Sequence, residues 1–94
     1  MGVSFIVHET SDSVGVAVRD LEARIPVRGR FQHSDGEVEI EVADAIPLGH
    51  KLAIVDIPQG GRVVKYGVPI GRATRAIRAG EHVHTHNLKG ERWA

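Results

Sequence analysis

A short unit that combines a turn with a strand occurs three times in the second half of the chain. Each copy reads isoleucine, two residues, glycine, two residues, then leucine or valine, and the copies begin at Ile46, Ile57 and Ile77. Proline follows the first two isoleucines and fixes φ, whereas glycine permits φ > 0, so each copy predicts a tight turn that starts a strand. The expected strands cover residues 50–57, 62–66 and 81–88. Repeated turns and strands are typical of a compact, bent, mainly β domain.

The first half of the chain is predicted to be mostly extended, with one short helix. Residues 3–8 alternate and are rich in β-branched and aromatic residues, which indicates a strand. Good N-cap residues precede residues 14–21, whose apolar positions have helical spacing, so a short helix is favoured there, although its valines also suit a strand. Residues 23–32 and the alternating residues 37–42 flank a Ser-Asp-Gly turn, which predicts a hairpin.

The length of the chain limits what it can enclose. Its 94 residues fit one domain, and 41% hydrophobic residues are enough for a modest core. A domain of this size buries about 60–65% of its unfolded surface, so a deep catalytic cleft would compete with the core for the same residues. We therefore expect a functional site that a partner completes.

The charge distribution argues against nucleic-acid binding. Lysine plus arginine and aspartate plus glutamate each number 12, which gives a formal net charge of zero. Nucleic-acid binders usually carry a basic excess on one face, and aromatic residues, at 4%, are too few here for a stacking platform. Near-zero charge suits a protein that works within a complex.

The absence of cysteine excludes both a disulfide framework and a thiolate site. A small fold without disulfides is compatible with a reducing compartment. The N-terminus has no basic segment followed by an apolar stretch, and no long apolar run occurs. We therefore expect a cytoplasmic protein without a membrane segment.

The segment Glu81–Asn87 is the part of the sequence richest in reactive side chains. If it is a strand, His82, His84 and His86 project from one face about 7 Å apart, and neighbouring imidazoles can converge on one metal ion. Histidine suits zinc, iron, nickel or copper, so the spacing does not select the metal. The alternative is a solvated strand face without a ligand. Asn87 either orients a ligand or ends the strand.

Other candidate site residues lie at strand ends. His50 follows a turn glycine and would add a fourth ligand or an acid–base group, unless it is simply a half-exposed strand end. Lys65 and Tyr66 offer a point charge and a donor for a substrate carboxylate, against the commoner reading of a surface lysine beside a half-buried tyrosine. Asp56 suits an arginine partner or a metal. Motifs for nucleotide binding and serine hydrolysis are absent.

Four stretches together resemble a known family. They are Gly49–Ile57, Val64–Gly67, Pro69–Ala73 and Ala79–Asn87. They are similar to the SAF domain of the altronate dehydratase family, which includes galactarate dehydratase and the sulfolactate sulfo-lyases. The resemblance covers about residues 3–88, is most specific from Gly49 onward, and implies a SAF-type β-clip.

The resemblance implies a function and a partner. In this family the domain is either the N-terminal part of a long dehydratase or a small subunit beside a large one. Members eliminate a leaving group from sugar acids or related 2-hydroxy acids, typically with a divalent metal such as iron or manganese. For such an elimination, the strand of His82, His84 and His86 offers metal ligands or a base, and the resemblance implies that a large subunit supplies the rest. We take His84, His86 and His50 as the candidate catalytic residues.

Several features depart from the family pattern. The family often has Asp-Asn where this chain has Asp12-Ser13, residues 22–45 match poorly, and residues 89–94 read as a flexible tail. The competing hypothesis is a freestanding module that binds a small acidic sugar or a protein without catalysis. A homo-oligomer is also compatible with the sequence.

Overall fold

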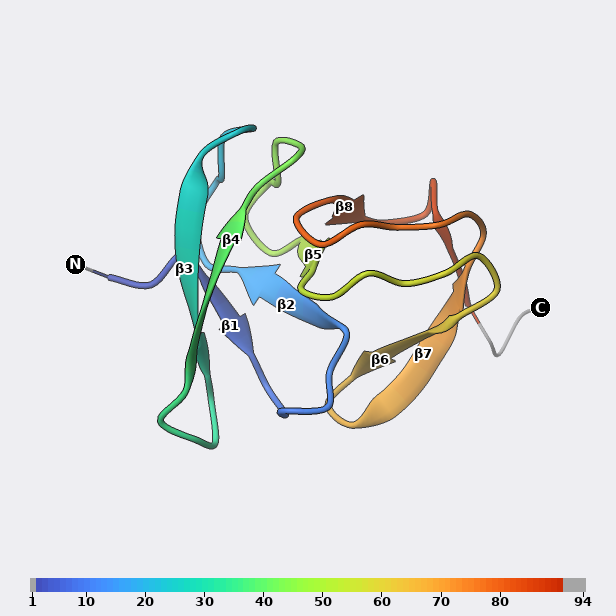
Figure 1. The fold of residues 1–94 in the computed structure, drawn as a ribbon, viewed down its shortest axis with the longest axis horizontal. Coiled ribbons are helices and arrows are strands. Elements are labelled where there is room, and N and C mark those ends of the chain that lie inside the picture. Colours follow the sequence, from blue (N-terminus) through green and yellow to red (C-terminus); the bar gives the residue numbers. More distant parts are fainter. Residues whose placement is uncertain (1, 91–94) are drawn as a thin grey trace.

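Nine short strands in two curled sheets make up residues 2–90, the part of the chain that the computed structural model describes (Figure 1). The strands are β1 (Phe5–Val7), β2 (Val14–Ala17), β3 (Pro26–Phe31), β4 (Glu37–Glu41), β5 (Lys51–Ala53), β6 (Arg62–Lys65), β7 (Val68–Ala73), β8 (His82–Val83) and β9 (Leu88–Gly90). One sheet has the order β4-β3-β1-β2-β5-β8 and the other β6-β7-β9. The mainly β prediction is confirmed. Within the described residues, no helix is long and apolar enough to cross a membrane.

The core consists of two hydrophobic clusters, one at each end of the long axis. Phe5 and Leu52 belong to the first cluster, Val63 and Val83 to the second, and all four are 0% exposed. A Cβ atom at Gly29 would collide with the ring of Phe5, so glycine lets this ring pack directly on the β3 backbone. Strands β2 and β5 separate the clusters, because neighbouring residues along each strand point to opposite faces.

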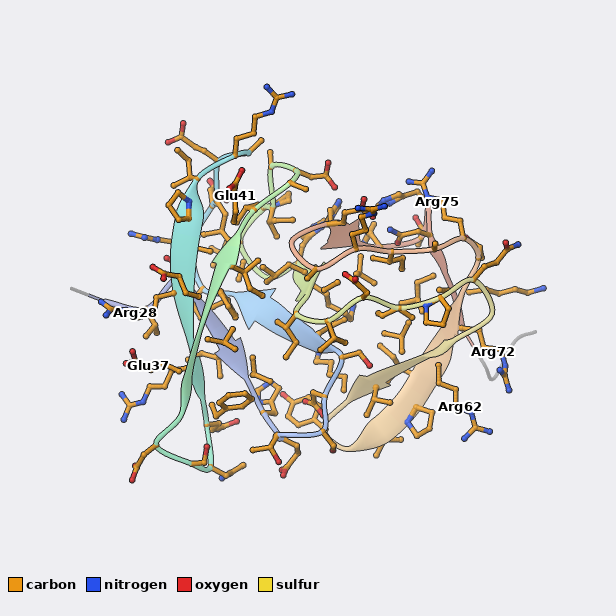
Figure 2. The ribbon with its side chains drawn as sticks, viewed as in Figure 1. Arg28, Glu37, Glu41, Arg62, Arg72 and Arg75 are labelled. Atoms are coloured by element: carbon orange, nitrogen blue, oxygen red, sulfur yellow. The ribbon has the colours of Figure 1, made fainter. Side chains whose placement is uncertain are left out.

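The expected hairpin on either side of the Ser-Asp-Gly turn is confirmed. β3 and β4 pair antiparallel from Pro26 opposite Glu41 to Arg30 opposite Glu37. Arg28 and Glu37 form an exposed ion pair across the hairpin, 3.8 Å from Nη1 to Oε1 (Figure 2). β3 also pairs with β1, in parallel.

The turns of the three repeated units form as the pattern predicts, and a strand starts after each, although β5 and β8 are shorter than expected. Gly49, Gly60 and Gly80 have φ values of 85°, 79° and 95°. In each turn the residue after the glycine donates its backbone N–H to the carbonyl three residues earlier, at 2.8–3.0 Å, as in a type II turn. The strands β5, β6 and β8 begin at the next residue.

The predicted helix over residues 14–21 is wrong. Residues Val14–Ala17 form β2, which pairs antiparallel with β1 and β5. Gly15 faces Phe5, and a Cβ atom at this position would lie 2.8 Å from the ring Cδ2, so the residue that weakens a helix is the one that admits this ring. Sheet pairing on both sides overrides the helical spacing of the apolar residues.

The predicted strand over residues 81–88 is confirmed only in part. β8 ends at Val83, a turn occupies residues 84–87, and the chain resumes as β9. β7 was not among the expected strands, and its Pro69 lies beside a register shift in the pairing of β6 and β7, where a strand can accommodate proline. Residues 89 and 90 of the expected tail belong to β9, and residues 91–94 lie outside the described part.

Candidate functional site: a histidine cluster

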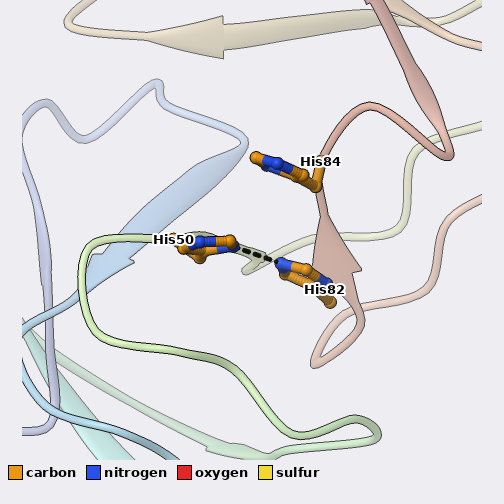
Figure 3. A group of neighbouring side chains, drawn as sticks. All are labelled: His50, His82 and His84. Carbon is orange, nitrogen blue, oxygen red and sulfur yellow. Dashed lines mark hydrogen bonds between the residues drawn. The ribbon is translucent and has the colours of Figure 1, made fainter.

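Three histidines at or beside the paired strands β5 and β8 point toward one another (Figure 3). One ring nitrogen each of His50, His82 and His84 lies within 4.8 Å of the other two. Nδ1 of His50 and Nε2 of His82 are 2.9 Å apart and share a hydrogen bond. The His50 and His84 rings stack with their centroids 4.6 Å apart. The cluster lies on the surface: His50 and His82 are half-buried and His84 is exposed.

The pairing of β5 with β8 brings the histidines together. Lys51 lies opposite Val83 and Leu52 opposite His82, so continuing the antiparallel register sets position 50 opposite position 84. Each of these strands starts after a repeated turn, which places His50 directly after the glycine of one turn and His82 two residues after the glycine of another. The internal repeat therefore builds the cluster.

Asn87 holds the turn that carries His84. Its side chain is 1% exposed. Oδ1 accepts the backbone N–H of His84 at 3.0 Å, and Nδ2 donates to the carbonyl of His82 at 2.8 Å. Both ends of the amide are thus bonded to the backbone on either side of Val83. These bonds end strand β8 and fix the position of His84 relative to His82.

Asp44 is the carboxylate that acts on the cluster. Its Oδ2 accepts the backbone N–H of His82 at 3.0 Å. Partial burial lowers the pKa of His82, the nearby imidazoles of His50, His86 and His84 lower it further, and the charge of Asp44 opposes them. His82 therefore stays neutral at lower pH than an ordinary histidine, which is the state that can accept a hydrogen bond or bind a metal.

The arrangement of the three rings fits a transition-metal ion. Nitrogen ligands about 2.1 Å from one tetrahedral ion lie about 3.4 Å from one another, so side-chain shifts of about 1–1.5 Å bring the most widely spaced nitrogens of the trio into range. Neutral imidazole is a good ligand for several divalent metals. Three protein ligands also leave a position for a substrate atom, as in catalytic rather than structural sites.

His86 was expected to share a strand face with His82 and His84. It lies instead in the turn of residues 84–87 and is exposed, with its ring centroid 5.3 Å from that of His82. It therefore borders the cluster without belonging to the close trio. His50 takes the third place because β5 pairs with β8, a long-range contact that local alternation does not reveal.

Lys65 and Tyr66 lie away from the histidines, at the β6–β7 turn on the opposite edge of the molecule from β8 (Figure 1). Tyr66 has φ 58°, and its ring stacks on His8 with the centroids 3.8 Å apart. The buried carboxylate of Asp12 accepts the backbone N–H groups of Tyr66 at 2.9 Å and Gly67 at 2.8 Å. The sequence marked Asp12 only as a capping residue, and its bonds to a turn 54 residues away had no local signal.

The carboxylate of Asp56, for which an arginine or a metal was considered, accepts the backbone N–H of Ala79 at 2.9 Å. The equivalent position of another repeated turn, Leu48, donates its N–H to Asp20 at 2.8 Å. These two carboxylates therefore support the turns that precede β8 and β5.

The curled β domain that carries the histidine cluster matches a known family. The altronate/galactarate dehydratase SAF domain matches residues 3–91. The chain therefore belongs to this family of SAF domains, as its resemblance predicted.

Individual relatives divide into small subunits and long enzymes. The (2R)-sulfolactate sulfo-lyase subunit alpha of Chromohalobacter salexigens is 48% identical over 94 residues, covering 99% of this chain and 100% of that protein. The altronate dehydratase of Bacillus subtilis is 44% identical over 92% of this chain, but the match spans only 16% of that enzyme. For the galactarate dehydratase (L-threo-forming) of Escherichia coli the values are 39%, 82% and 13%.

Proposed function

We propose that this chain is the small SAF-domain subunit of a lyase that acts on a sugar acid or another 2-hydroxy acid together with a large catalytic subunit. The match along the whole length of a sulfo-lyase subunit alpha supports a separate small subunit. The dehydratases, in which the same domain is 13–16% of a longer chain, support the need for a much larger partner. We class the curled sheets as a SAF-type β-clip in a cytoplasmic enzyme.

The observation that carries this proposal is the trio of His50, His82 and His84. We assign to it a divalent metal, iron or manganese by family resemblance. A metal held there would supply Lewis-acid chemistry for the departing group. Partial burial and the neighbouring imidazoles favour neutral His82 against the opposing charge of Asp44, and a neutral imidazole binds a metal without first losing a proton.

We assign proton transfer to the imidazoles that face solvent. An elimination needs a base for the proton α to the carboxylate and an acid for the leaving group. His86 is exposed, borders His82 and is outside the trio, so its ring nitrogens are available to accept or return a proton. His84 and His50 are the remaining candidates for this role. The leaving group is water in a dehydratase and sulfite in a sulfo-lyase.

The open position of the cluster supports dependence on the large subunit. His84 and His86 are exposed, and elimination requires substrate-binding groups and exclusion of water around the reacting atoms. Lys65 and Tyr66 stay predicted carboxylate ligands. Because they lie on the opposite edge from β8, the carboxylate that they bind would belong either to a second ligand or to a part of the substrate away from the histidines.

The experiment is a pull-down of the tagged chain from its native cell extract, followed by mass spectrometry and assay of the recovered complex. We expect a large dehydratase or sulfo-lyase subunit, with turnover by the complex and none by either chain alone. Recovery of no such subunit, under conditions that preserve other complexes, would contradict the proposal and favour the freestanding binding module.

A further inference from the structure

Leu48 is a large apolar side chain that the fold does not need at its position. It lies at the tip of the first repeated turn and is 61% exposed. The second turn has the same backbone hydrogen bond and a glycine with φ 79° in place of 85°, yet it carries the polar, exposed Gln59 at the equivalent position. A leucine is therefore not required to make this turn.

Val18 is a second exposed apolar side chain, on the chain segment that pairs with this turn. It is 45% exposed. The preceding residue, Ala17, donates its N–H to the carbonyl of His50 and accepts the N–H of Gly49, both at 2.9 Å. These bonds, with that from the Leu48 N–H to Asp20, place the backbone of residues 17–20 beside that of residues 48–50, which carries His50. We call these two side chains the Leu48 patch.

We propose that the large lyase subunit docks on the Leu48 patch as it closes over the histidine cluster. This inference rests on the proposed function and adds where the partner binds. The histidines are open to solvent, so the chain that supplies the missing groups must cover them. Leu48 is two residues from His50, so it lies at the edge of any surface that covers the His50 ring.

An interface of ordinary size that covers the histidine cluster also extends to the Leu48 patch. Such an interface buries about 800 Å² on each partner, roughly one seventh of the 5738 Å² surface of this chain. A patch of that area extends about 16 Å from its centre. A hollow lined by Asp20, Leu21 and Ile25 adjoins the Leu48 turn, since Asp20 accepts the Leu48 N–H, and offers room for a side chain of the partner.

The test is the Kd between the chain and the large subunit recovered with it, measured by calorimetry for wild type and three variants. Leu48→Gln gives the first turn the side chain of the second, and should weaken binding about tenfold to a hundredfold, because a buried leucine contributes that much. Val18→Gln should weaken it about fivefold to tenfold. Both variants should unfold at the wild-type temperature, since the changed side chains face solvent in the free chain.

The matched control is Val68→Gln. Val68 is 55% exposed, close to the value for Leu48, but lies at the start of β7 on the opposite edge from β8 (Figure 1). Its Kd should stay within about twofold of wild type. Wild-type Kd for Leu48→Gln, or an equal loss for Val68→Gln, would overturn the docking proposal.

Two further outcomes are distinguishable. A wild-type chain that binds no large subunit would contradict the proposed function, and the docking proposal with it. A wild-type chain that forms homodimers which Leu48→Gln dissociates, while binding of the large subunit is unchanged, would overturn the docking proposal alone. Native mass spectrometry of the same samples separates these cases.

Discussion

Two turns of this molecule share a backbone but differ in chemistry. In Pro47–His50 and Pro58–Gly61 the closing N–H···O distances are 3.0 and 2.8 Å, and the glycine φ values are 85° and 79°. A buried isoleucine precedes each turn, and a residue that is 0% exposed follows two positions after its end. The first turn presents Leu48 and His50 to the surface, whereas the second presents Gln59 and Gly61.

The difference separates what the fold requires from what function adds. Isoleucine, glycine and the later apolar residue recur because the turn and the core need them. The residue at the tip of the turn and the residue after the glycine differ between the two turns. The two turns are not identical at this last position, because a Cβ atom at Gly61 would lie 2.8 Å from the Pro58 carbonyl oxygen, whereas the first turn accommodates His50.

The largest effect is expected when the first turn is given the sequence of the second. His50→Gly gives the first turn the residue that follows the glycine in the second, and removes one member of the trio. We expect kcat/KM of the complex to fall about a hundredfold to ten-thousandfold, with the chain still folded. His50→Ala is the control for added backbone freedom. Steady-state assay with circular dichroism measures both, and retained turnover in the two variants would remove His50 from the site.

The third turn shows that the turn glycines differ in how closely the backbone packs around them. Gly80 has φ 95°, and a Cβ atom there would collide with the carbonyl oxygen of Glu41, whereas nothing lies within 4 Å of a Cβ atom at Gly60. Gly60→Ala should cost about 1–2 kcal/mol for its left-handed φ. Gly80→Ala should cost about 3 kcal/mol or more, because the collision is with backbone. Urea unfolding measures both, and equal costs would contradict the packing described for Gly80.

The support of the cluster should matter less than its members. Asn87→Ala leaves the His84 N–H and the His82 carbonyl without their partner, so the histidines lose their fixed relation. We expect metal affinity to fall about tenfold to a hundredfold, as for other residues that orient ligands. Thr85→Ala, an exposed change in the same turn, should leave it unchanged. Competitive titration with a chromophoric chelator gives both affinities, and wild-type affinity in Asn87→Ala would remove its positioning role.

The smallest effect concerns pH. The pKa of His82 is lowered from 6.5 in the folded chain, so the unfolded chain binds more protons at this site just below pH 6.5. The free energy of unfolding of the metal-free chain should therefore fall as pH decreases from 7.5 to 5.5. The fall should be smaller in His82→Gln. Urea midpoints at the two pH values measure this, and a larger fall in His82→Gln would contradict the direction of the shift.

Local sequence patterns correctly predicted the elements that are determined by interactions between residues close in the sequence. The repeated turns and the hairpin of β3 and β4 follow from glycine, proline and alternation, and they were predicted correctly. The helix over residues 14–21 failed because pairing of β2 with two other strands overrides helical spacing.

The site was predicted in part for a similar reason. The sequence identified the histidine segment, but alternation alone continues a strand through residues 81–88. The Asn87 amide instead bonds the backbone on both sides of Val83 and turns the chain. His50 was expected as a fourth member and enters as the third because of the β5–β8 register, which joins residues about 30 positions apart.

The most direct test is the metal content of the chain after loading with Co²⁺, whose absorption spectrum reports imidazole ligands, in wild type, His50→Gln and His86→Gln. The structure predicts one ion per chain in wild type and in His86→Gln, and none in His50→Gln, because His50 belongs to the close trio and His86 does not. An ion kept by His50→Gln and lost by His86→Gln would contradict this account. It would return the site to the three alternating histidines that the sequence first indicated.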